Sequence, residues 1–243
     1  MLADFHIHST YSDGVLTIPE IVDLYGRNGF GSIAITDHLC EEKTFLGKAA
    51  KYLNKTLTQY TFGNYLEEIQ TEQERAWRLY KMKLIAGVEI TKNSLFNHRS
   101  AHIVILGVEN FIAADLSIGH ILQTAKDQGA LTIAAHPVFT RQIEKQTYHL
   151  WDHREELRKV IDVWEVASGR HLFYEVAKEK LPMIANSDLH RPEQLSSWKT
   201  LLSCEKNQEA IFENIRKQKV DFRYFDHSLT ALSHTARPQF SVL

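Results

Sequence analysis

Two histidines stand near the start of the chain with a single residue between them, in the stretch His6-Ile7-His8. In an extended strand alternate side chains leave the same face, so both imidazoles would point in one direction. Two neutral imidazoles on one face can bind a single divalent metal ion. Ser12-Asp13-Gly14 follows and predicts a turn whose short carboxylate can reach back to the same place. The pair alone is weak evidence, because neighbouring histidines are often solvated or hydrogen-bonded without a metal.

Further side chains of the metal-ligand type follow, most of them where a predicted strand gives way to a loop. His102 is the exception, because it stands at the start of its predicted strand. The carboxyl ends of the strands carry the active site in parallel α/β barrels, so these side chains are expected to converge there. The full candidate set is His6, His8, Asp13, His38, Glu89, His102, His136, Asp188 and His190.

This set also predicts the number and kind of metal ions. A single tetrahedral or five-coordinate ion uses three or four protein ligands, so the set is too large for one ion and fits two or three. Carboxylates can bridge such ions, and paired ions stabilise attacking and leaving oxygens in phosphoryl displacement. The high share of histidine favours zinc, iron or manganese over magnesium or calcium.

The elements that must position these side chains alternate between strands and helices. Thr17 predicts a helix N-cap with Glu20 completing a capping box, and Gly29 predicts the end of that helix. Short connections between strand, helix and strand indicate right-handed parallel units. The pattern predicts an α/β fold with a closed or nearly closed barrel of seven strands, at residues 2–7, 32–36, 83–88, 101–106, 130–135, 160–166 and 182–186.

Residues 41–83 interrupt the alternation and are interpreted as a helical insertion over one end of the barrel. Apolar residues from Tyr65 to Tyr80 predict a packed helix within it. A scaffold role is the default for such a helix, with a lid or specificity element as the alternative. Residues 229–243 have little periodicity and are expected to form an irregular tail.

Composition limits the class of protein. A chain of 243 residues with 44% hydrophobic content predicts one domain over residues 1–243. A formal net charge of −2 argues against long nucleic acids as partners and leaves a short oligonucleotide open as a partner.

Cys40 and Cys204 are far apart in the sequence and match the reduced thiols of a cytoplasmic protein. The charged N-terminus does not fit a signal peptide, and no apolar run approaches membrane-spanning length. Nothing in the sequence predicts the oligomeric state.

The ordered motifs resemble the polymerase and histidinol phosphatase (PHP) domain family of metal-dependent phosphoesterases. The matching pieces span residues 4–190 and are His6-Ile7-His8 with Ser12-Asp13-Gly14, Thr36-Asp37-His38, Gly87-Val88-Glu89-Ile90, His102, Ala135-His136-Pro137 and Ser187-Asp188-Leu189-His190. The resemblance implies a distorted seven-stranded (β/α) TIM-like barrel, a trinuclear metal site and phosphoesterase activity. It assigns His6, His8, Glu89 and Asp188 to one ion, His102 and His136 with bridging Glu89 to a second, and Asp13, His38 and His190 to a third.

The hypothesis for function is hydrolysis of a phosphomonoester or a small phosphodiester. A water that bridges two metals loses its proton near neutral pH, and the hydroxide attacks phosphorus. Asp37 is a candidate for orienting a ligand histidine, with a turn cap as the alternative. Loop residues supply the remaining candidates. Those for phosphate binding are Arg141, Arg170 and Arg191, and those for a general acid are His171 and His98.

Three other functions fit parts of the pattern. A nuclease or oligonucleotide phosphoesterase would use the same metals. An amidohydrolase-type C–N hydrolase also uses an H-x-H pair after its first barrel strand, although Asp13 and His38 fit it poorly. Outside enzymes, a catalytically inactive, metal-stabilised binding module would be favoured by an inert residue at a ligand position, and the sequence has no such gap.

Overall fold

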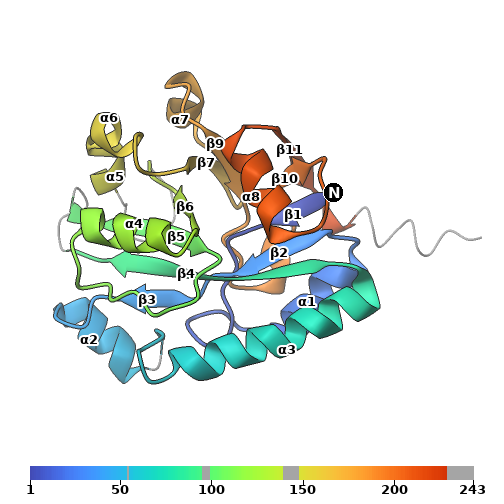
Figure 1. Ribbon diagram of the computed structural model, residues 1–243, viewed down its shortest axis with the longest axis horizontal. Coiled ribbons are helices and arrows are strands. Elements are labelled where there is room, and N and C mark those ends of the chain that lie inside the picture. The colour runs from blue at the N-terminus through green and yellow to red at the C-terminus, as the bar shows by residue number, and fades with distance from the viewer. Residues whose placement is uncertain (54, 95–98, 139–147, 229–243) are drawn as a thin grey trace, which may run out of the picture.

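The computed structural model describes residues 1–53, 55–94, 99–138 and 148–228, and Figure 1 shows how their helices and strands are arranged. The strands are β1 (Leu2–Asp4), β2 (Ser32–Ile35), β3 (His38–Cys40), β4 (Lys83–Lys92), β5 (Ala101–Leu106), β6 (Leu131–Ala134), β7 (Val163–Ser168), β8 (His171–Leu172), β9 (Met183–Asn186), β10 (Ser197–Leu202) and β11 (Val220–Phe225). The helices are α1 (Ile18–Arg27), α2 (Phe45–Tyr52), α3 (Phe62–Tyr80), α4 (Ile118–Asp127), α5 (Tyr148–Asp152), α6 (Arg154–Leu157), α7 (Tyr174–Lys178) and α8 (Gln208–Arg216), with a 3-10 turn at Pro192–Leu195.

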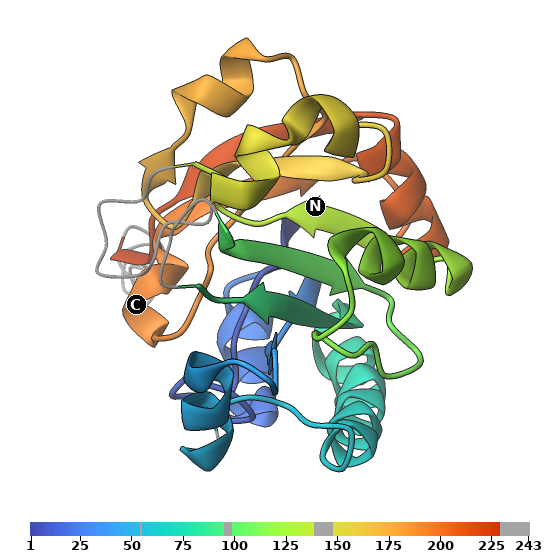
Figure 2. The same cartoon turned by 90° about the vertical axis from the view of Figure 1, so that its left-hand side faces the viewer.

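One curled, mixed sheet contains all of these strands and forms a half-barrel (Figure 2). Its main order is β11-β10-β1-β2-β4-β5-β6-β7-β8, with β3 beside β4 and β9 beside β7. Parallel pairs join β1 to β2, β2 to β4, β6 to β7 and β7 to β9. The strand β5 runs antiparallel to both of its neighbours, β4 and β6. The amino end of β5 therefore lies at the same edge of the sheet as the carboxyl ends of the parallel strands.

The α/β class is confirmed, but the prediction of seven strands is not. In the described part of the chain the sheet has eleven strands. Two of the additional strands, β3 and β8, are too short to give a periodic signal. The other two, β10 and β11, form an antiparallel pair at the edge of the sheet. Local periodicity detects strands but not their direction, so the alternation with helices suggested a more regular barrel.

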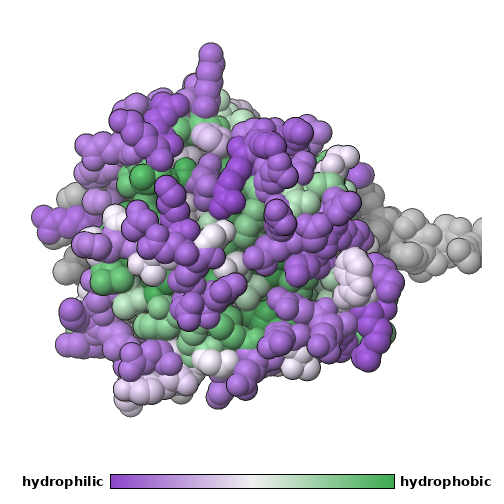
Figure 3. Space-filling model, viewed as in Figure 1, coloured by the Kyte–Doolittle hydropathy of each residue, from purple (hydrophilic) through white to green (hydrophobic). Residues whose placement is uncertain are grey.

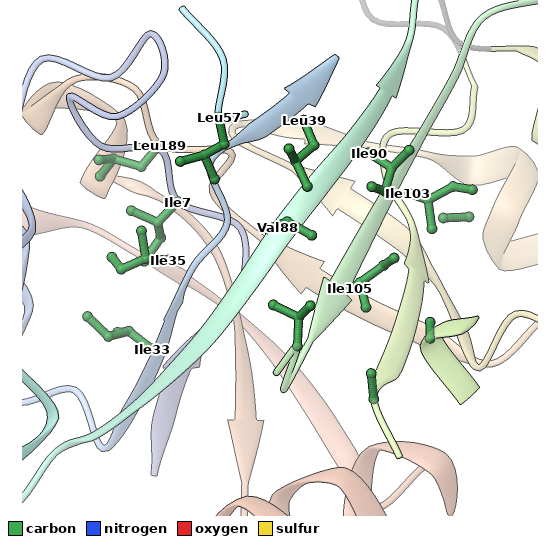
Figure 4. Close-up of a cluster of buried hydrophobic side chains, with 14 of the residues drawn as sticks. Ile7, Ile33, Ile35, Leu39, Leu57, Val88, Ile90, Ile103, Ile105 and Leu189 are labelled. Atoms are coloured by element: carbon green, nitrogen blue, oxygen red, sulfur yellow. The ribbon is translucent and has the colours of Figure 1, made fainter. Parts of the chain in front are cut away.

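The strands bury side chains on both faces because each face packs against helices or against the curled sheet itself. Figure 4 shows one such layer, in which Val88 of β4 lies between Ile33 and Ile35 of β2 on one side and Ile103 and Ile105 of β5 on the other. Side chains of α1 and α3 belong to the same apolar cluster, and Figure 1 shows α3 running beneath β4. The intervening residues, such as Ala34, point to the other face and pack with α8.

The predicted helix boundaries are confirmed where the sequence supplies caps. Thr17 caps α1, its side chain accepts from the backbone N–H of Glu20, and the Glu20 carboxylate accepts from the Thr17 N–H. Gly29 follows the helix with φ of +76°, a conformation that glycine adopts without strain. The predicted helix from Tyr65 to Tyr80 is also present as most of α3, which packs against β4 and α1.

The remaining observations concern the outer surface, the helices and the two cysteines. Figure 3 shows one face of the molecule largely covered by hydrophilic residues, with hydrophobic residues visible between them. In the described part of the chain, no helix combines the length and the apolar character needed to cross a membrane. Cys40 and Cys204 are free cysteines. The tail at residues 229–243 lies outside the described residues.

Candidate metal centre

The side chains predicted as metal ligands meet at one edge of the curled sheet. His6 and His8 follow β1, His38 opens β3, and His136 follows β6. Glu89 lies within β4, and Asp188 and His190 follow β9. Near the start of the antiparallel strand β5, His102 reaches the same edge, which explains why it alone stands at the start of its predicted strand. All of these elements therefore deliver their side chains to one place.

Three overlapping groups of ligand atoms result, and in each group the atoms lie within 4.8 Å of one another. The first group is His6, His8 and Glu89, and Asp188 Oδ1 adjoins it at 3.4 Å from His6 Nε2 and 3.3 Å from His8 Nε2. The second is Glu89, His102 and His136. The third is His8, Asp13, His38 and His190. These groups follow the sets that the family resemblance implied, except that His8 also adjoins the third one.

Several atoms of the centre are buried yet make no hydrogen bond within the described structure. They are His6 Nε2, His8 Nε2, Asp13 Oδ1, Glu89 Oε2 and His190 Nε2. Leaving a buried polar atom without a partner costs about 1–3 kcal/mol, so such atoms are rare unless something binds them. All five atoms can donate a lone pair to a divalent transition metal, and they face one another across short distances. The residues present therefore fit a cluster of metal ions.

The electrostatics of the centre are those of facing imidazoles and carboxylates. Burial lowers the pKa of His8 to about 3, with help from the neighbouring His190 and His38. Burial also opposes protonation of His6, but Asp188, Glu89 and Glu165 outweigh it and raise the pKa of His6 well above its usual value. At His136 and at His190, nearby carboxylates raise the pKa to about 9 against the effect of burial.

The carboxylates shift in the opposite direction. Burial raises the pKa of Glu89, yet the charges of His102, His38 and His6 hold it well below its ordinary value. The pKa of Asp188 is lowered in the same way, mainly by His6 and His190 against the effect of burial. Glu89 and Asp188 are thus ionised at neutral pH, as metal ligands must be.

A carboxylate that the sequence analysis did not single out supports two of the three groups. Glu165 of β7 is fully buried, and its Oε1 accepts from His6 Nδ1 at 3.0 Å and from Asn186 Nδ2 at 2.9 Å. Its Oε2 accepts from the backbone N–H of His136 at 2.7 Å. Holding the proton of His6 on Nδ1 leaves the lone pair on Nε2, which faces the cluster.

Two polar networks hold the loops that carry the ligands. Asp37 accepts from the backbone N–H and the hydroxyl of Ser9, at 2.8 and 2.7 Å, and from Ser12 Oγ at 2.6 Å. It therefore orders the turn before Asp13 and reaches His8 only through Ser12, whose Oγ lies 3.5 Å from His8 Nδ1.

The second network holds the backbone that precedes Asp188. Asp4 accepts from the Ser187 N–H at 2.9 Å, from Tyr25 OH at 2.7 Å and from Lys199 Nζ at 2.5 Å. Ser187 directly precedes Asp188, whose φ of 52° is unusual for a residue with a side chain. Such strained backbone persists only where its surroundings fix it, and His136 with φ of 27° is a second example at this centre.

A cavity of about 280 Å³ opens onto the centre. Its described lining combines ligands of all three groups with side chains from β3, α2 and the segment after α2. Of the predicted substrate residues, Arg170, Arg191 and His171 are absent from this described lining. Arg170 and Arg191 are exposed, and His171 is half-buried in β8. Arg141 and His98 lie outside the described residues, so the structure does not place them.

Comparison with known proteins agrees with this arrangement. The family model described as PHP domain matches residues 4–161. A two-domain protein from Bacteroides vulgatus, described as containing a predicted PHP-like metal-dependent phosphoesterase, superposes with a TM-score of 0.68 at 22% identity. The alignment covers 92% of this chain and 64% of that protein, so the chain spans less than two thirds of its length.

PsfC from Pseudomonas syringae superposes with a TM-score of 0.58 at 14% identity, over 96% of both chains. No curated protein matches the chain. At these identities the two solved structures show a shared fold, whereas the family model covers more than half of the sequence. The chain therefore belongs to the PHP domain family.

Proposed function

We propose that this chain is a metal-dependent phosphoesterase that hydrolyses a phosphomonoester or a small phosphodiester. Its cofactors would be two or three divalent transition-metal ions, with zinc, iron and manganese as the candidates. The observation that supports this most is the convergence of buried imidazole nitrogens and carboxylate oxygens on one small volume, where five of these atoms make no hydrogen bond to a described residue. Membership of the PHP domain family supports phosphoester hydrolysis as the chemistry.

The ligand groups assign the ions to residues. One ion would be held by His6, His8, Glu89 and Asp188, and a second by His102 and His136 with Glu89 shared. Asp13, His38 and His190 would hold the third. Ions bound there would lower the pKa of coordinated water toward neutrality and neutralise phosphoryl oxygens.

The protein's own residues prepare the site for this chemistry. Glu165 keeps the proton of His6 on Nδ1, and the buried position of Glu89 keeps bulk water away from the shared ligand. The cavity of about 280 Å³ is close to the lower end of the usual range for ligand sites. It therefore favours a small phosphorylated substrate over an enclosed oligonucleotide.

Metal content and phosphate release test the proposal together. Purified protein is expected to hold two or three transition-metal ions. Treatment with a strong chelator should abolish hydrolysis over a panel of phosphoesters, measured as phosphate from monoesters and as the released alcohol from diesters. His190→Asn is expected to lower the metal content by about one ion and phosphate release by at least about a hundredfold, because a ligand of the third group is removed.

His120→Asn provides a matched control. This residue lies in the first turn of α4, where its ring bonds with the Ser117 hydroxyl, and it belongs to none of the three groups. It should leave both readouts unchanged. Equal phosphate release with and without chelator, or full metal content in His190→Asn, would contradict the proposal.

A further inference from the structure

One part of the cavity wall comes from outside the metal centre. Leu46 and Ala50 of α2, together with Lys55 just beyond it, line the same cavity as the ligands. They belong to the segment from residue 41 onward that interrupts the alternation of strands and helices. A segment that forms a cavity wall can select substrates only if the rest of the protein fixes its position.

The start of this segment is fixed by polar contacts. Glu41 Oε1 pairs with Lys92 Nζ of β4 at 2.6 Å. The Thr44 hydroxyl caps α2 by accepting from the Gly47 N–H at 3.0 Å. A Cβ on Gly47 would lie 1.6 Å from the carbonyl oxygen of Glu41, so only glycine permits this close approach. The amino end of α2 is thus held against the sheet.

The other end is fixed directly to a strand of the metal centre. The Lys55 N–H donates to the Ala50 carbonyl at 2.8 Å. The Thr56 hydroxyl accepts from the Cys40 N–H at 2.9 Å and donates to the His38 carbonyl at 3.1 Å. The N–H of Leu57 donates to the same His38 carbonyl at 2.8 Å. Lys55 is therefore anchored next to β3, the strand that begins with a predicted ligand.

Charge distinguishes Lys55 from the rest of the lining. Among the described lining residues it is the one lysine or arginine, and its ammonium group has no ion pair or hydrogen bond to any described residue. Between residues 43 and 60 the sequence has four lysines and no acidic residue, so nothing nearby in the chain neutralises it. Leu46 and Ala50 supply apolar surface beside this charge.

We propose that Lys55, with Leu46 and Ala50, selects phosphoesters whose organic part is compact and apolar and carries a second anionic group. The inference rests on the proposed function, in which the metal ions already neutralise the phosphoryl oxygens. The ammonium group of Lys55 in the cavity wall is then available to bind a carboxylate or a second phosphate at the far end of the substrate. The apolar surface disfavours a sugar, whose hydroxyls would lose their hydrogen bonds to water.

Binding of compounds that cannot be hydrolysed tests this independently of turnover. Metal-loaded protein is titrated by calorimetry with benzylphosphonate, 4-(phosphonomethyl)benzoate and p-xylylenediphosphonate, which share one body and differ in the second anion. The wild type is expected to bind at least one of the two compounds with a second acidic group about fivefold to tenfold more tightly than benzylphosphonate. Lys55→Met should remove this preference and leave the affinity for benzylphosphonate unchanged. The carboxylate and phosphonate compounds show which anion is preferred.

The controls separate this inference from the proposed function. Lys48→Met removes a lysine of α2 that is absent from the described lining, and it should retain the preference. If Lys55→Met weakens all three compounds equally, Lys55 binds the phosphoryl group and the inference is wrong. It is also wrong if the wild type shows no preference or no binding. A wild type that shows the preference but hydrolyses no phosphoester would instead overturn the proposed function.

Discussion

Replacing Glu165 by glutamine should weaken metal binding although Glu165 is not itself a predicted ligand. The wild-type carboxylate accepts three hydrogen bonds, from His6 Nδ1, Asn186 Nδ2 and the backbone N–H of His136. An amide offers one accepting oxygen in place of two. The backbone N–H of His136 cannot reverse its polarity, so the amide oxygen is expected to remain there. The amide NH2 group then faces two donors, His6 Nδ1 and Asn186 Nδ2.

This conflict acts on the metal centre through the tautomer of His6. If His6 gives up the proton on Nδ1 to accept from the amide, its Nε2 becomes protonated and cannot bind a metal. If it keeps that proton, the two donors repel each other and the ring turns away. Loss of such a carboxylate–histidine contact typically reduces metal affinity by about 10- to 100-fold. The expected cost is therefore about 1.4–2.7 kcal/mol for an ion at the group of His6 and His8.

Competition with a chromophoric chelator at neutral pH measures this loss ion by ion. Glu165→Gln should weaken ions that depend on His6 or His136, whereas the ion held by His190 should keep its affinity. Glu72→Gln is the matched control, because Glu72 is a nearly buried carboxylate of α3 that pairs with Arg75 Nε at 2.7 Å, away from the centre. Wild-type affinity for every ion in a folded Glu165→Gln protein would refute the reasoning.

Two further predictions concern the ions and the turn before the first helix. In the metal-free protein, His136 and His190 have pKa values of about 9, above the ordinary 6.5, so their protonation stabilises the fold below pH 6.5 and this contribution is lost as pH rises to about 9. The unfolding temperature of the chelated protein should therefore fall between pH 6.5 and 9, whereas that of the metal-loaded protein should stay level. Identical pH profiles for the two samples would contradict this. A Cβ on Gly14 would lie 2.2 Å from the carbonyl oxygen of His8, so Gly14→Ala should displace the turn that carries Asp13. The chelator titration should then show one ion weakened by about tenfold or more, and unchanged binding of all ions would count against this account.

The sequence was sufficient to predict the α/β class, the first capped helix and the side chains that meet at the centre. It succeeded there because strands, caps and ligand-type residues leave local patterns. His102 shows the limit, since its position at the start of a strand makes sense only when β5 is antiparallel to β4. Strand direction depends on pairing between distant segments, which periodicity does not record.

The residues around the ligands were harder to predict for two different reasons. Glu165 did leave a signal, because a carboxylate between Trp164 and Val166 in an apolar strand must find a partner when buried. Lys55 left none, since nothing local separates it from the other lysines near α2. Arg170 and Arg191 are predicted from their place after strand ends, yet both are exposed and absent from the described cavity lining. A loop position predicts the end of the sheet on which a side chain lies, but not where that side chain points.

The arrangement of ligands also explains why the centre needs such a rigid support. Glu89 belongs to two of the ligand groups, and His8 belongs to two as well. A displacement of either residue would therefore change two ligand groups, whereas a displacement of His190 would change one. Both shared ligands are fully buried, Glu89 in the longest strand of the sheet and His8 beside it. The fold thus places the ligands that are shared between groups where close packing restricts their motion most.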